Sequence, residues 1–193
     1  MVAAPFAFVT AVVDARGLVV TSVGDHACRV EPQTTELPWF CDLDDGTPTG
    51  ENNPASFVRW VCPALRRRPT VSGAAAGPVL EVRRSGPQSD LGRLVQRLGR
   101  LAGRAATPPA GGDADGPFVY TDPGGILDLG MWHRIESWPA ARHGDGVVRP
   151  AELSAIKVTR EGLVVESVSW WDSAPALDHQ IGLAVDIARR LAA

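Results

Sequence analysis

The sequence lacks long apolar runs and has few cysteines, and each scarcity excludes a class of protein. No stretch of about 18 apolar residues occurs, so no membrane span is predicted. The three cysteines, Cys28, Cys41 and Cys62, are scattered and form no CxxC pair, which argues against a disulfide framework and a structural zinc site. The first residues carry no basic stretch typical of a secretion signal, so we expect a cytoplasmic protein with reduced thiols.

An excess of positive charge is also lacking, because 19 Lys and Arg stand against 22 Asp and Glu, the net charge is −3, and Lys157 is the sole lysine. A nucleic-acid-binding surface needs clustered cations to neutralise phosphates, so we expect no nucleic acid partner. Hydrophobic residues, in contrast, make up 45% of the 193 residues, which is typical of a globular domain. We therefore expect residues 1–193 to form a single domain with flexible loops near 32–53 and 107–116.

The N-terminal half predicts a hairpin followed by helices. Two β-rich runs, Phe8–Val13 and Leu18–Val23, flank turn residues and predict an opening hairpin. Proline at position 54, followed by apolar residues at helical spacing as far as Leu65, predicts a helix. A short strand is expected at 79–82 and an amphipathic helix from Asp90 to Arg104.

The C-terminal third predicts strands closed by a helix. Ile126–Trp138 is predicted to be a long strand. Glu152–Val158 and Leu163–Trp171 then form a hairpin around the turn at 159–162. Apolar residues recur at helical spacing from Ala176 to Ala193, which predicts a terminal helix. The whole pattern indicates an α+β protein.

Two segments of this third resemble a known family. The run Thr159-Arg160-Glu161-Gly162-Leu163-Val164-Val165, ending in Ser169-Trp170-Trp171-Asp172, resembles the last hairpin of SnoaL-like proteins in the nuclear transport factor 2-like superfamily. Trp132-His133-Arg134-Ile135-Glu136 resembles a strand of limonene epoxide hydrolase-type members, which carries an arginine and an acid two residues apart. The resemblance covers about residues 118–177. It implies a cone-like fold, in which a strongly curved, mostly antiparallel sheet packs against helices.

Two features depart from that family. Its members begin with two helices, whereas a hairpin is predicted here. Ser169 stands near the position of the second-strand acid of the epoxide hydrolases, so that particular reaction is not implied.

Alternate residues of a strand share a face, and this leaves two candidate sites open at 126–138. If the apolar face lines a pocket, His133 is its titratable group and could move protons near pH 7. If the other face does, Arg134 would keep Glu136 ionised and could polarise a substrate oxygen. Asp172, at a strand end, is a candidate general acid or base. Candidate substrate-binding residues are Met131, Trp132 and Trp170.

The sequence carries no glycine-rich phosphate loop, no nucleophile elbow and no metal-spaced histidines, so we expect no cofactor and no metal. The resemblance implies a small-molecule-binding protein that, as an enzyme, would be a cofactor-free cyclase, isomerase or hydrolase using acid–base proton transfer on an apolar metabolite. The alternative is a PAS- or GAF-like sensory or interaction module without catalysis, because residues 11–20 resemble the opening hairpin of such domains. A non-catalytic subunit that pairs through its sheet is a third reading, and a homodimer is expected in every case.

Overall fold

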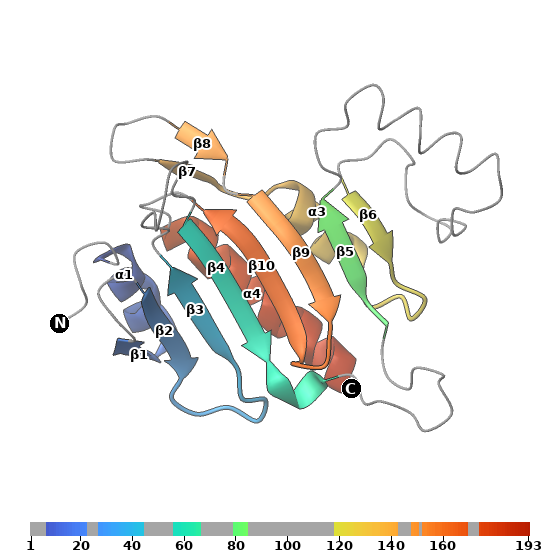
Figure 1. Ribbon diagram of the computed structural model, residues 1–193, viewed down its shortest axis with the longest axis horizontal. Helices are drawn as coiled ribbons and strands as arrows, with labels where there is room; N and C mark the ends of the chain where they lie inside the picture. The colour runs from blue at the N-terminus through green and yellow to red at the C-terminus, as the bar shows by residue number, and fades with distance from the viewer. Residues whose placement is uncertain are drawn as a thin grey trace.

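The described part of the chain forms one open eight-stranded sheet whose three helices lie on the same face (Figure 1). The computed structural model describes residues 7–22, 27–44, 56–66, 79–84, 118–142, 148–150, 152–169 and 174–193. All neighbouring strands run antiparallel, in the order β1-β2-β3-β4-β10-β9-β5-β6. The expectation of an α+β fold is therefore confirmed. No described helix is both long enough and apolar enough to cross a lipid bilayer.

The elements have the following bounds. The sheet contains β1 (Leu18–Ser22), β2 (Ala27–Pro32), β3 (Phe40–Asp44), β4 (Ser56–Cys62), β5 (Glu81–Arg84), β6 (Phe118–Thr121), β9 (Glu152–Val158) and β10 (Leu163–Ser169). The helices are α1 (Ala7–Arg16), α3 (Leu129–Glu136) and α4 (Ala174–Ala192), and a 3-10 turn, η2, spans Pro63–Leu65. Two short strands, β7 (Ala140–Arg142) and β8 (Val148–Pro150), pair separately.

The core lies between α4 and the middle of the sheet. Trp60 of β4 and Val165 of β10 are opposite one another and fully buried beneath α4. Ile181, Ala184 and Ile187 of α4 recur every three residues and are equally buried. Burial of each large aliphatic side chain contributes about 1.5–3 kcal/mol. This stripe explains why the terminal helix was predictable, and the prediction is confirmed.

The β9–β10 hairpin is also as predicted. Leu163 pairs with Val158, and the amide of Thr159 donates to the carbonyl of Gly162 at 2.8 Å to close the turn. The register shifts between Glu166 and Ser167, which marks a β-bulge.

The predicted opening hairpin is wrong in its first half, because residues 8–13 belong to α1. Val9 and Val12 are three residues apart, and both are buried in the core, as one face of a helix requires. The second run does form a strand, β1. Packing of α1 against α4 therefore overrides the β propensity of the valines.

The helix predicted up to Leu65 is wrong, because Ser56–Cys62 is strand β4. Val58, Trp60 and Cys62 alternate toward the helices, whereas Arg59 points to the opposite face. β4 pairs with β3 on one side and with β10 on the other, so both of its edges are hydrogen-bonded.

The strand predicted at 126–138 is wrong as well, because it contains α3. Leu127, Met131 and Ile135 are buried at intervals of four, whereas Leu129 is 87% exposed, which contradicts alternation. The carboxylate of Asp128 accepts from the amide of Met131 at 2.9 Å and caps the helix.

Four further expectations fall in regions that the structure describes only in part or not at all. β3 lies inside the loop expected at 32–53, and β5 overlaps the strand expected at 79–82. The helix expected from Asp90 to Arg104 and the loop at 107–116 lie outside the described residues.

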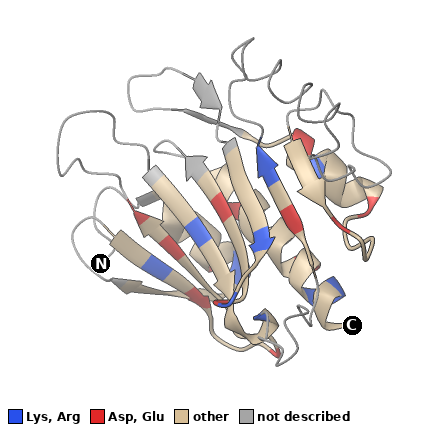
Figure 2. Ribbon diagram, turned by 45° about the vertical axis from the view of Figure 1, so that its right-hand side comes forward, with Lys and Arg blue, Asp and Glu red and all other residues tan. Residues whose placement is uncertain are grey.

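The sheet face away from the helices carries charges of alternating sign (Figure 2). Arg29, Asp42, Arg59 and Glu166 lie opposite one another across β2, β3, β4 and β10. Arg29 pairs with Asp42 at 2.6 Å, and Glu166 accepts from Arg59 at 3.2 Å and from Lys157 at 2.8 Å. One polar face is normal for an antiparallel sheet, and such partly exposed pairs contribute little each.

The three cysteines provide a test of the core. Cys28, Cys41 and Cys62 are free, buried and placed on the adjacent strands β2, β3 and β4. Burial raises the pKa of Cys28 to about 12 and also raises those of Cys41 and Cys62. Because the thiolate is the reactive form, we expect no reaction with Ellman's reagent in the native protein and three reactive thiols in guanidinium chloride. Rapid native labelling of any of them would contradict this core.

Candidate functional site

All the predicted site residues that the structure describes lie on α3. His133 and Glu136 are exposed, and Arg134 is half-buried. Residues of a strand alternate between two faces, whereas successive residues of a helix are rotated by about 100°, so the two alternative faces expected at 126–138 do not exist in α3. Asp172 and Trp170 lie outside the described residues. The roles proposed for these five residues stay predictions.

Arg134 joins α3 to α4. Its guanidinium donates to the carboxylate of Asp186 at 2.6 Å and to the carbonyl of His179 at 3.4 Å. In return, Nε2 of His179 donates to the carbonyl of Arg134 at 2.8 Å. Trp138 and the imidazole make a T-shaped contact with ring centroids 5.0 Å apart. The position of Arg134 is therefore explained by its role in joining α3 to α4.

The two predicted substrate-binding residues of α3 also pack against the rest of the fold. Met131 is buried in the core. Trp132 is half-buried and packs against Tyr120 of β6 at a tilt, with ring centroids 4.5 Å apart. Both side chains therefore attach α3 to the edge of the sheet.

His179 makes the α3–α4 contact sensitive to pH. Desolvation lowers the pKa of its imidazole from the ordinary value of 6.5, so folding favours the neutral form. That stabilisation is complete above pH 6.5 and is lost as the pH falls below it, because the unfolded chain then binds more protons. We expect urea denaturation to show that the free energy of unfolding decreases as the pH is lowered below 6.5.

His179→Gln is the matched control for that pH dependence. The glutamine amide can still donate to the carbonyl of Arg134 but does not titrate. The slope below pH 6.5 should therefore flatten in this variant. Carboxylates such as Asp178, whose pKa is lowered by its hydrogen bond from Arg16, act only at more acidic pH. An unchanged slope would assign the effect to another group.

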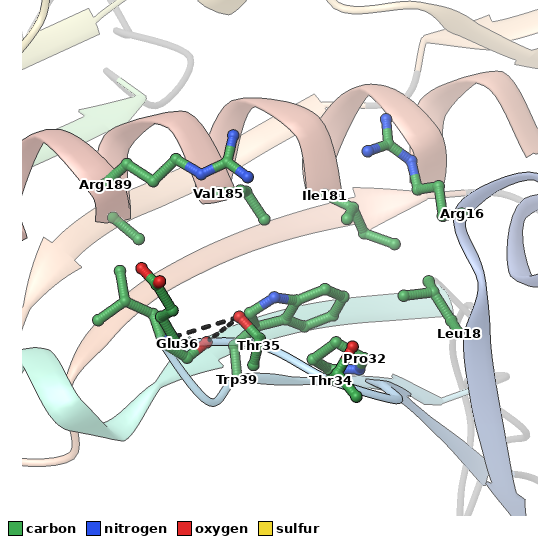
Figure 3. A pocket seen from close by; sticks show the side chains of 12 residues that line it. Arg16, Leu18, Pro32, Thr34, Thr35, Glu36, Trp39, Ile181, Val185 and Arg189 are labelled. Atoms are coloured by element: carbon green, nitrogen blue, oxygen red, sulfur yellow. Dashed lines mark hydrogen bonds between the residues drawn. The ribbon is translucent and has the colours of Figure 1, made fainter.

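A pocket of about 350 Å³ lies elsewhere, between α4 and the segment that links β2 to β3 (Figure 3). None of the predicted site residues that the structure describes lines it. Its lining comes from α1, the start of β1, the end of β2, the linking segment and α4. The lining residues are Arg16, Leu18, Pro32, Thr34, Thr35, Glu36, Leu37, Trp39, Ile181, Val185, Ala188 and Arg189.

The pocket has an aromatic and aliphatic wall. Trp39 is 9% exposed and stacks at a tilt on the buried Trp60, with ring centroids 5.6 Å apart. Ile181 and Val185 face it from α4 (Figure 3). Thr35 shapes the linking segment locally. Its hydroxyl accepts from the amide of Leu37 at 3.2 Å and donates to the carbonyl of Leu37 at 3.1 Å. Packing of Trp39 on Trp60 therefore fixes the apolar wall, and the turn at Thr35 shapes the rim of the pocket.

The charges of the pocket differ in how they are engaged. Arg16 donates to the carboxylate of Asp178 at 2.5 Å and to its carbonyl at 2.9 Å, which ties α1 to α4. Arg189 is 74% exposed, and its closest acid within the described chain is Asp186 at 3.9 Å. Glu36 is exposed and makes no hydrogen bond or ion pair with any described residue. Arg189 and Glu36 are thus the charged groups of the pocket that remain available to a ligand.

Sequence reasoning missed this pocket because Glu36 and Trp39 fell inside an expected loop. A tryptophan within an otherwise polar loop was the available signal, since such a side chain seldom lacks a packing partner. Among the described residues, no group of three or more His, Cys, Asp or Glu side chains could hold a metal ion.

Comparisons with known proteins give no relative for this chain. No protein-family model, no curated protein and no solved structure matches it. The resemblances to SnoaL-like proteins and to PAS or GAF domains therefore stay predictions.

Proposed function

We propose that this chain is a small-molecule-binding domain that acts without catalysis, and that its ligand occupies the pocket between α4 and the β2–β3 segment. The observation that carries the proposal is a hollow of about 350 Å³ with Trp39 on one wall and charged residues at its rim. Ligand sites are commonly concave, mainly apolar and furnished with a few polar groups, at volumes from about 300 Å³ upward.

The lining of the pocket favours binding over reaction. Acid–base catalysis needs a proton-transferring group placed against the substrate. Among the described lining residues, Glu36 is the sole carboxylate. There is no histidine, cysteine or lysine in that lining. This composition supports the non-catalytic sensory reading over the cyclase, isomerase or hydrolase reading.

A neutral fluorescent probe, N-phenyl-1-naphthylamine, tests the pocket. We expect a saturable rise in its fluorescence with the wild-type protein. Val185→Trp should weaken binding at least about tenfold, roughly 1.4 kcal/mol, because the indole would fill the space beside Trp39. Val19→Trp adds the same group to an exposed site on the other face of the sheet and should change nothing. Absence of saturable binding, or equal binding by both variants, would contradict the proposal.

Finer expectations accompany this function. We carry forward a SnoaL-like, cone-shaped arrangement of the sheet, a cytoplasmic location and a homodimer as proposals. The dimer would pair through the sheet face that carries Arg29, Asp42, Arg59 and Glu166, because the described helices leave this face uncovered. Light scattering after size-exclusion chromatography checks it, since a monomeric mass at micromolar concentration would exclude a stable pair.

A further inference from the structure

We propose that the ligand is a small zwitterion with an apolar side chain, that is, an aliphatic α-amino acid whose carboxylate binds Arg189 and whose ammonium binds Glu36. This inference rests on the proposed binding function and adds the chemical class of the ligand. It starts from two opposite charges that share the mouth of the pocket and make no ion pair with each other.

Arg189 and Glu36 reach the pocket from opposite walls. Arg189 comes from the last turn of α4, and Glu36 comes from the segment between β2 and β3. Figure 3 shows both at the same end of the pocket, with Arg16 at the other end. A ligand between these walls can therefore meet a cation and an anion together.

A zwitterion satisfies both groups, whereas a singly charged ligand satisfies one. An anion bound at Arg189 would lie close to the carboxylate of Glu36, and a cation bound at Glu36 would lie close to the guanidinium of Arg189. Unfavourable charge pairs of this kind are how binding sites reject the wrong partner. A carboxylate can accept two parallel hydrogen bonds from a guanidinium, which gives the arginine an orienting role.

Arg16 is not a second anion site. Its guanidinium is engaged by both the carboxylate and the carbonyl of Asp178, so a ligand would have to break the tie between α1 and α4. The charges available to a ligand therefore lie at one end of the pocket, where Arg189 and Glu36 are found.

The apolar wall of the pocket indicates the nature of the uncharged part of the ligand. Trp39, Ile181 and Val185 present apolar surface next to the charged end. A volume of about 350 Å³ is at the lower end of the range for small-molecule sites and suits a compact molecule. A branched aliphatic side chain would remove this surface from water at about 25 cal/mol per Å² of apolar area.

Three probes with the same hydrocarbon body separate the charges of the ligand. L-leucine carries both groups, 4-methylpentanoate lacks the ammonium, and 3-methylbutylamine lacks the carboxylate. Isothermal titration calorimetry at low salt should show leucine binding up to about fivefold more tightly than either relative, since each lost contact with an exposed charge is worth at most about 1 kcal/mol. Equal affinities for the three probes would overturn the zwitterion.

Two variants then assign each charge to its residue. Arg189→Gln should abolish the preference for leucine over 3-methylbutylamine and leave the preference over 4-methylpentanoate. Glu36→Gln should do the reverse. Both side chains are exposed, so the fold should tolerate either change. Arg160→Gln and Asp14→Asn alter the net charge equally at exposed positions outside the pocket and should leave all three affinities unchanged.

The probe N-phenyl-1-naphthylamine separates failure of this inference from failure of the function. If the probe binds, is excluded by Val185→Trp and is not displaced by leucine, the pocket binds another class of ligand and the zwitterion is wrong. If the probe does not bind, the proposed function fails together with the inference. Displacement by leucine that weakens in both Arg189→Gln and Glu36→Gln supports the inference.

Discussion

Gly162→Ala is expected to lower the free energy of unfolding by about 3 kcal/mol or more. Gly162 has a φ of +137°, a conformation that side chains seldom adopt. A methyl group there would overlap the carbonyl of Cys62 and lie 2.9 Å from the Cα of Pro63, both of which are backbone atoms that cannot move aside cheaply. The clash falls where β10 begins beside the end of β4, in the middle of the sheet. Chemical denaturation followed by circular dichroism measures the loss.

Gly125→Ala is the matched control for Gly162. Gly125 also has a positive φ, of +59°, but its missing Cβ has nothing within 4 Å. Only the backbone penalty applies, so this change should cost about 1–2 kcal/mol. The difference between the two variants isolates the steric term at Cys62. Equal losses would show that β4 and β10 do not approach so closely at this turn.

Gln180→Met is expected to lower the free energy of unfolding by about 2–3 kcal/mol. Gln180 is 1% exposed at the contact between α4 and the sheet. Its amide nitrogen donates to the carbonyls of Val165 at 3.0 Å and Val58 at 3.3 Å, and its oxygen accepts from the hydroxyl of Ser167 at 2.5 Å. Methionine keeps the length of the side chain and removes every one of these bonds, so the buried hydroxyl loses its partner.

A double-mutant cycle with Ser167→Ala apportions that loss. If the Ser167–Gln180 bond contributes, the double variant should be less destabilised than the sum of the two single variants, by about 1 kcal/mol. Gln33→Met makes the same replacement at an exposed position and should stay within about 0.5 kcal/mol of the wild type. A Gln180→Met protein as stable as the wild type would show that apolar packing alone holds α4 on the sheet.

The spacing of apolar residues in the sequence correctly predicted those elements in which the same residues are the buried ones. α4 has apolar residues every three or four positions and a single buried stripe, so its pattern has one interpretation. β9 and β10 have β-branched residues on both sides of a glycine turn, and the hairpin they form has only short-range register to specify. In these segments, secondary structure follows from neighbouring residues.

Where the apolar spacing fits both a helix and a strand, contacts with residues far away in the sequence decided the secondary structure. Leu127, Met131 and Ile135 satisfy both a period of two and a period near four, and only the exposure of Leu129 separates a helix from a strand. The β4 segment likewise has apolar residues that satisfy either period, and its pairing with β3 and β10 selected the strand.

The sequence by itself determined the α+β class, the last hairpin and the terminal helix, because each depends on contacts between residues close together in the chain. The tertiary structure alone decided where a ligand could bind. The pocket brings Leu18, Trp39 and Val185 together from β1, the β2–β3 segment and α4, and no local pattern records that proximity. It also decided which arginine is available to a ligand. Arg16 is engaged by Asp178 only because α1 docks on α4, whereas Arg189 stays exposed.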